Sequence, residues 1–113
     1  SRLQMRDLVQ GVTGWNTSLF ELEKAGERAL AMARAFNCRE GFTAADDVPP
    51  WRFSAPLKGG AAEGVAIPED TLQDALDLFY EMNGWDRETG APKAAKLHEL
   101  GVGWVTDLLE GEQ

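Results

Sequence analysis

The sequence predicts an all-α fold of about four to five helices, interrupted by one long irregular segment rich in proline and glycine. Apolar residues recur at three- and four-residue steps in several stretches, as they do along one side of a helix. No stretch shows the sustained alternation of apolar and polar residues that indicates a half-buried strand. Glycine follows most of the periodic stretches, where helices commonly end. We therefore expect one helical domain over residues 1–113.

Two helices are predicted in the first third of the chain. Residues 3–12 carry a short apolar pattern that ends between Gly11 and Gly14. Ser18 and Glu21 then have the spacing of a capping box, in which the hydroxyl and the carboxylate each accept from a backbone N–H. An apolar stripe follows over a helix of roughly 20 residues. Its members are Leu19, Leu22, Gly26, Ala29, Leu30, Ala33 and Phe36. Ala25 and the small members of the stripe predict the close approach of a neighbouring helix.

Residues 41–68 are predicted to lack regular structure. Prolines at 49, 50, 56 and 68 and glycines at 59, 60 and 64 punctuate the segment, and both residue types interrupt helices and strands. A loop of this length is unusual unless it is functional or packed on something else. Because Trp51 and Phe53 are large and apolar, we expect them to be buried.

The last third predicts further helices. Apolar spacing returns over residues 72–82, with acidic residues before it at the positive end of the helix dipole and Asn83-Gly84 after it. Pro92 can open another helix that Gly101 closes. A last short helix is expected around Trp104 to Leu109.

Composition and charge exclude several classes of function. The apolar fraction of 43% and charged fraction of 27% are typical of a globular protein. A net charge of −8 disfavours binding to nucleic acid or to an anionic membrane, and no apolar run approaches the roughly 20 residues of a membrane span. No secretory leader is visible. We expect a cytoplasmic protein, and the absence of an initiator Met before Ser1 suggests a fragment of a longer chain.

Most candidate catalytic or ligand sites have a simpler explanation. The glycines at 59, 60 and 64 do not follow a strand, and Lys58 precedes them, which favours a surface turn over a phosphate loop. Residues 86–90 lack the alternating oxygen ligands of a calcium loop. His98 has no neighbouring partner in the sequence for a catalytic triad. Cys38 is the single cysteine; it cannot form an internal disulfide or complete an iron–sulfur site, and we interpret it as a buried thiol.

Phe36-Asn37-Cys38-Arg39-Glu40-Gly41 concentrates polar chemistry at the end of the long helix. One interpretation is a helix C-terminus, with Arg39 favoured by the dipole and Gly41 in a left-handed turn. The other is a structural hub in which Arg39 and Glu40 bond loop carbonyls and amides, with Asp46 or Asp47 among the partners. Neither requires catalysis, and both remain open from the sequence.

These residues belong to a series of short motifs that resembles the C-terminal, third domain of the aldehyde ferredoxin oxidoreductases. The pieces run in order through most of the chain, and each is weak by itself. They are Thr13-Gly14, Gly26-Glu27-Arg28, Phe36-Asn37, Arg39-Glu40-Gly41, Asp47 with Pro49, Phe79-Tyr80, Gly84-Trp85-Asp86, Gly90 with Pro92, and Leu97 with Leu100-Gly101. Pro50-Trp51 departs from the pattern, which tends to have a small or basic residue there.

The resemblance implies an enzyme that oxidises aldehydes to carboxylic acids and passes electrons to ferredoxin. Such enzymes hold tungsten, sometimes molybdenum, in a bis-pterin cofactor (tungstopterin) beside a [4Fe–4S] cluster. The family's Asp-x-x-Gly-Leu-Cys motif does not occur here, and its metal-proximal acidic and histidine residues would precede residue 1. We therefore expect no catalytic, cofactor or metal residue in this fragment, which is expected to be inactive by itself.

The expected role is architectural, with the remaining domains of the parent enzyme as partners. Residues proposed for a structural hub or domain interface are Asn37, Arg39, Glu40, Asp47, Trp51, Trp85 and Asp86. An exposed, tryptophan-rich apolar face and self-association are also expected. The alternative is a free-standing acidic helical interaction module, with Trp51, Trp85 and Trp104 as anchors for a partner.

Overall fold

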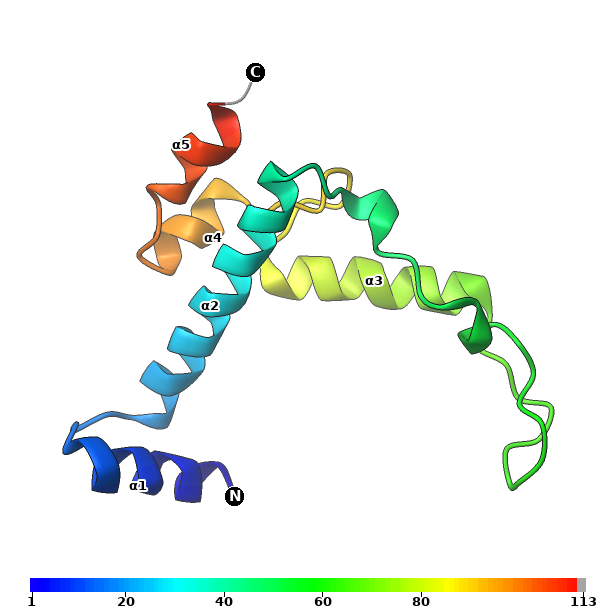
Figure 1. Cartoon of the computed structure of the whole chain (residues 1–113), viewed down its shortest axis with the longest axis horizontal. Coiled ribbons are helices and arrows are strands. Elements are labelled where there is room, and N and C mark those ends of the chain that lie inside the picture. The colour runs from blue at the N-terminus through cyan, green and yellow to red at the C-terminus, as the bar shows by residue number, and fades with distance from the viewer. Residues whose placement is uncertain (112–113) are drawn as a thin grey trace.

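The computed structural model describes residues 1–111 and confirms the all-α class (Figure 1). Its five α-helices are α1 (Arg2–Thr13), α2 (Leu19–Arg39), α3 (Glu69–Asn83), α4 (Ala94–Glu99) and α5 (Val105–Glu110). Two short 3₁₀ helices, η1 (Ala44–Asp46) and η2 (Trp51–Phe53), lie in the irregular segment. Within the described residues there is no strand, only one bridge between Trp85 and Pro92.

Caps confirm the predicted boundaries at Gly14, Ser18 and Gly84, whereas the prediction that Pro92 opens a helix is wrong, because α4 begins at Ala94 and Pro92 is bridged to Trp85. At the start of α2, Glu21 N donates to Ser18 Oγ at 3.2 Å and Ser18 N donates to Glu21 Oε2 at 2.7 Å. Gly14 after α1 and Gly84 after α3 adopt φ values of 72° and 67°. This left-handed conformation is open to glycine without steric cost.

The buried core is small and lies where α2, α4 and α5 meet. Leu97 and Leu100 are fully enclosed, and Leu109 packs against the core from α5. The other members of this cluster are Ala31, Ala35, Val102 and Val105. Ion pairs tie α4 to α2 beside the core: Lys24 Nζ lies 2.7 Å from Glu99 Oε1, and Lys96 pairs with Glu27.

The predicted close approach of a neighbouring helix to the small residues of the α2 stripe is wrong for the described residues. Only Leu19 and Leu22, at the start of the stripe, are partly buried, beside α1. The chain buries the opposite side of the helix, which carries Ala31, Arg34 and Ala35. Leu30 and Phe36 are 46% and 57% exposed. The small residues of the stripe are exposed as well, so no neighbouring helix approaches them within the described residues.

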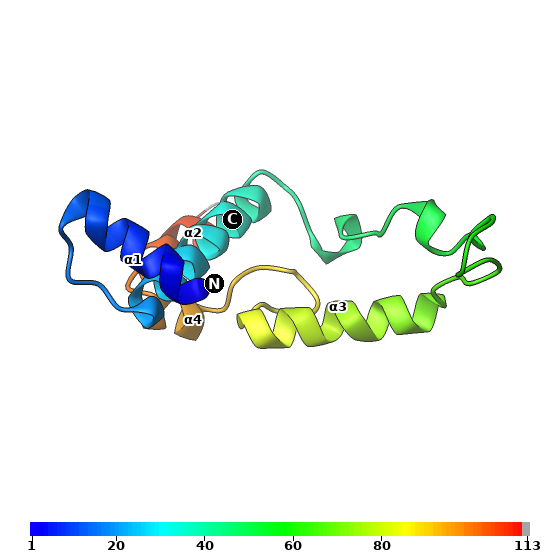
Figure 2. The same cartoon turned by 90° about the horizontal axis from the view of Figure 1, so that it is seen from below.

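The elements form an open, flat arch (Figures 1 and 2). Helix α1 and the first half of α2 make one leg, α3 makes the span, and residues 54–67 make the other leg. Residues 42–53 run along α3, and the chain then extends beyond it. Trp51 is 81% exposed and Phe53 44%, so the expected burial of this aromatic pair does not occur within the chain.

The dimensions show how little of its surface the chain buries alone. Its radius of gyration is 18.3 Å, against about 13 Å for a compact domain of this length. Its accessible surface is 8320 Å², against about 6100 Å² for a compact monomer of this mass. The excess of roughly 2000 Å² equals the area of a substantial protein interface.

Candidate functional site

Arg34 and Asp47 form the best-defined polar site in the structure. Arg34 occupies the middle of α2, between the small residues Ala31 and Ala35, and is only 9% exposed. Its Nη1 donates to Asp47 Oδ1 at 2.9 Å and its Nη2 donates to Asp47 Oδ2 at 2.6 Å. This two-pronged geometry matches a planar guanidinium to a carboxylate. It fixes the irregular segment to the longest helix.

Two aromatic residues complete the surroundings of this ion pair. The Tyr80 hydroxyl, from the last turn of α3, donates to Asp47 Oδ2. The Arg34 guanidinium lies 4.9 Å from the ring centre of Trp85 and 5.7 Å from that of Tyr80. A cation held against aromatic faces is stabilised by the ring quadrupoles. Both aromatic side chains are buried, at 4% and 5% exposure.

A tight turn after α3 supplies the last partner of Arg34. Asp86 Oδ1 accepts from Glu88 N at 3.0 Å and from Thr89 N at 2.8 Å, which orders the turn. Gly90 follows with φ +76°, and its carbonyl accepts from Arg34 Nε at 2.7 Å. We call Arg34, Asp47, Tyr80, Trp85 and the Gly90 carbonyl the Arg34 cluster. It joins α2, the irregular segment, α3 and the 86–90 turn at one point.

The electrostatics of the cluster fit a structural brace. The Arg34 guanidinium beside Asp47 is the main cause that holds the pKa of that carboxyl below its usual value, and the Tyr80 hydroxyl adds to the effect. Burial, with the bond to Asp47, raises the pKa of Tyr80 to about 12. At neutral pH Asp47 is ionised, Arg34 charged and Tyr80 protonated. None of them is poised to exchange a proton near pH 7, as a general acid or base must be.

The structure divides the residues proposed for a hub. Asp47 and Trp85 belong to the Arg34 cluster, and Asp86 shapes the turn beside it. Arg39 and Glu40 instead pair with each other at the surface, with Nη2 of Arg39 3.1 Å from Oε1 of Glu40. Asn37 and Trp51 are exposed. Of the two interpretations of residues 36–41, the hub in which Arg39 bonds loop carbonyls is wrong, because Arg34, five residues earlier, binds Asp47 and Gly90. The helix C-terminus fits better, because α2 ends at Arg39 and Gly41 adopts φ 99°.

Sequence reasoning missed Arg34, and it named Tyr80 and Gly90 only as parts of the family motifs, not as site residues. A charged residue in the middle of a helix usually faces solvent, so Arg34 gave little reason for attention. One signal was available: Arg34 lies three residues after Ala31 and four before Cys38, on a side of α2 with small residues. A long cation beside small residues can fold back into a space that they leave open.

Cys38 is the only residue of this region whose chemistry could suit the metal groups that the resemblance implies. Cys38 is half-buried, and burial raises the pKa of its thiol despite the nearby Arg34. The thiolate that would ligate a metal is therefore disfavoured. A [4Fe–4S] cluster needs four such ligands, and the sequence has one cysteine. Among residues 1–111 no three His, Cys, Asp or Glu side chains are grouped as metal ligands. These residues do not fit either metal group, and no chemical step is assigned through them.

Two further features of the chain bear on function. His98 is exposed on α4, with its ring packed over Gly103, where an added Cβ would lie 2.3 Å from Nδ1. None of the helices in the described part of the chain has the length and apolar character needed to cross a bilayer.

Comparison with known proteins gives a consistent result. The family described as aldehyde ferredoxin oxidoreductase, domains 2 & 3, matches residues 2–102. The tungsten-containing aldehyde ferredoxin oxidoreductase of Pyrococcus furiosus is 34% identical over 99 residues, which cover 86% of this chain and 16% of that protein. The Thermococcus kodakarensis and Pyrococcus abyssi proteins of the same name are 31% and 29% identical over the same lengths.

The chain therefore spans about one sixth of the length of these relatives. The match extends from the start of α1 to Val102, just before α5, and includes every member of the Arg34 cluster. The chain belongs to the aldehyde ferredoxin oxidoreductase family.

Proposed function

We propose that this chain is the C-terminal helical domain of a tungsten-dependent aldehyde oxidoreductase and acts as an architectural part of that enzyme. The parent reaction adds an oxygen from water to an aldehyde, gives a carboxylic acid, and releases two protons and two electrons. In the complete enzyme a [4Fe–4S] cluster would pass the electrons to ferredoxin. Tungstopterin supplies the oxidation chemistry when bound, with molybdenum as the less common metal. The site of action is proposed to be the cytoplasm.

One observation carries the proposal: the chain matches the family over residues 2–102 and yet buries little surface by itself. The relatives are about six times longer than the matched segment. The excess accessible surface of roughly 2000 Å² is what an obligate interface would cover. The exposed apolar side of α2 has the same explanation, because a helix patterned for burial gains free energy only when a neighbour covers it.

The residues of the chain then have a defined task within the enzyme. The Arg34 cluster sets the angle between α2 and α3 and so holds the arch open. The ion pairs of Lys24 and Lys96 attach α4 to α2. Together they present a preformed surface to the rest of the enzyme. The family match supports a domain of a larger enzyme and not the alternative, a free-standing acidic interaction module. The net negative charge alone does not favour that module.

The test begins with the reading frame that precedes Ser1. We expect it to continue upstream and to encode the cysteines of an iron–sulfur cluster. The complete polypeptide should oxidise aldehydes with a one-electron dye as acceptor and contain tungsten, and a version without residues 1–113 should lose both properties. A start codon directly ahead of Ser1, or full activity without these residues, would refute the proposal.

A further inference from the structure

Helix α3 has three chemically distinct sides. The side that faces the irregular segment carries Leu72, Leu76 and Tyr80, which are buried or partly buried. A second side carries the acidic residues Asp70, Asp74, Asp77 and Glu81. The third side, which we call the α3 apolar side, carries Ala75, Leu78, Phe79 and Met82. Each set has the three- and four-residue spacing of one helix side.

The α3 apolar side is largely uncovered within the described residues, where only Phe79 has an aromatic neighbour, with its ring centre 5.5 Å from that of Trp85. Leu78, Phe79 and Met82 are 57%, 45% and 74% exposed. Single exposed apolar residues are common on protein surfaces, but these are aligned and the acidic residues are confined to another side of the same helix. Contiguous apolar surface of this kind indicates an interaction site.

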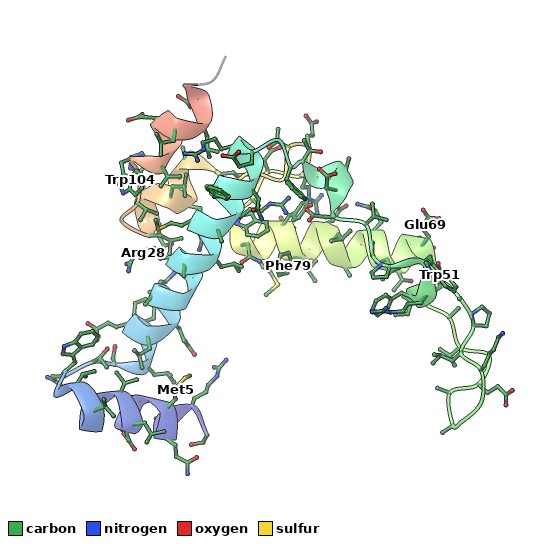
Figure 3. All side chains as sticks on the ribbon, viewed as in Figure 1. Met5, Arg28, Trp51, Glu69, Phe79 and Trp104 are labelled. Atoms are coloured by element: carbon green, nitrogen blue, oxygen red, sulfur yellow. The ribbon has the colours of Figure 1, made fainter. Side chains whose placement is uncertain are left out.

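The α3 apolar side faces the interior of the arch. Figure 3 shows Phe79 on the side of α3 that borders the opening, and Met5 on α1 across the same opening. Met5 is 54% exposed, and no residue of α1 is buried. One leg and the span of the arch thus present the apolar residues Met5 and Phe79 toward a common space. A folded body placed there would contact both.

We propose that the interior of the arch, with the α3 apolar side at its centre, receives an apolar face of the remainder of the oxidoreductase polypeptide. This inference rests on the proposed function and adds which surface of the chain makes the contact. The matched residues cover only about one sixth of the relatives' length, so the remainder of such a polypeptide is large enough to fill the arch. A second copy is a poorer occupant, because each copy carries a net charge of −8 and like charges oppose close association.

The experiment compares the isolated chain with the complete enzyme. Leu78→Gln and Met82→Gln are combined in one variant, since glutamine has a helix propensity close to that of leucine and methionine. In the isolated chain the helical signal and unfolding temperature should not change, because both positions are already exposed to water. In the complete enzyme the temperature that destroys half of the aldehyde-oxidising activity should fall by several degrees.

The matched control combines Asp74→Asn and Glu81→Gln on the acidic side of α3, and should change neither preparation. A second measurement does not depend on folding of the variant: peroxide oxidation of Met82 should be at least about tenfold slower in the complete enzyme than in the isolated chain. Equal oxidation rates, or equal effects of the two variants on the complete enzyme, would overturn the inference.

Two other outcomes are also decisive. If the glutamine variant instead abolishes a dimer of the isolated chain and leaves the complete enzyme unchanged, a second copy occupies the arch and the inference is wrong. If no complete enzyme is encoded, the proposed function itself fails at the reading-frame test. The two failures are therefore distinguishable.

Discussion

Arg34 and Asp47 connect the longest helix to the irregular segment through two parallel N–H···O bonds of 2.9 and 2.6 Å. The arginine is buried and the carboxylate about one quarter exposed. Tyr80 binds the same carboxylate from α3, so three separate segments meet at one ion pair. Arg34 lies between the core residues Ala31 and Ala35 on the buried side of α2, so this contact joins the irregular segment and α3 to the helix that carries the core.

Removal of the carboxylate should therefore destabilise the fold. Asp47→Ala leaves the buried Arg34 guanidinium without its partner, which typically costs about 3 kcal/mol. Glu40→Ala is the matched control, since it removes an ion pair with Arg39 at the surface, worth about 0.5 kcal/mol. Urea unfolding followed by circular dichroism measures both. Similar losses in the two variants would show that the Arg34 cluster does not brace the arch.

Acid should weaken the same contact. Arg34 lowers the pKa of Asp47 in the folded chain, against about 3.9 in an unfolded one. A lowered folded-state pKa contributes stability that is fully present above about pH 4 and is lost as the pH falls through the folded value. Other carboxylates also titrate in this range, so the relevant quantity is the difference in unfolding free energy between the natural chain and Asp47→Asn. That difference should shrink from pH 6 to pH 2, and a constant difference would contradict the assignment.

A rise in pH should lower the stability of the fold through ionisation of Tyr80. Its folded-state pKa is raised to about 12 from a usual value of 10.0, so its contribution to stability is full below about pH 10 and is lost as the pH rises through about 12. Tyr80 is the only tyrosine, which lets the ultraviolet absorption of tyrosinate report its titration directly. Titration near pH 10 in the folded chain would mean that the hydroxyl is not held by Asp47.

The Gly90 position should tolerate no side chain. A Cβ there would lie 2.2 Å from Arg34 Nη2 and 3.0 Å from Ala44 N, at φ +76°. Gly90→Ala should cost more than the roughly 1–2 kcal/mol of a left-handed alanine alone. Gly64→Ala isolates that backbone cost, because Gly64 has φ +81° with nothing within 4 Å. Thermal unfolding of the two variants compares them, and equal losses would place Gly90 outside the cluster.

Local rules were enough to predict the helices but not their orientation. Ser18 with Glu21, Gly14 and Gly84 each mark a boundary through bonds made within a few residues, and such bonds need no knowledge of the rest of the fold. The core-facing side of α2 could not be predicted in this way. Its apolar stripe is left exposed, and the pattern alone cannot tell whether the neighbour that covers a stripe belongs to the same short chain.

The cluster was predictable only in part for a related reason. Asp47 and Trp85 were found through short motifs. One interpretation of the sequence paired Arg39 with loop groups that include Asp46 or Asp47, whereas the arginine that binds Asp47 is Arg34, five residues earlier. The two arginines are five residues apart on α2. At 100° of rotation per residue, their side chains leave the helix in directions about 140° apart. Only the position of the 44–47 segment decides which one meets the carboxylate, and that position depends on contacts far apart in the sequence.

The central claim is that the surface exposed in this chain is covered by the rest of an oxidoreductase. Oxidative labelling of the tryptophans tests it most directly. In the isolated chain Trp15, Trp51 and Trp104 are 66%, 81% and 57% exposed, while Trp85 is 5% exposed. In the complete enzyme we expect the labelling of the three exposed tryptophans to fall several-fold, with Trp85 protected in both preparations. Unchanged labelling of all three would contradict the claim.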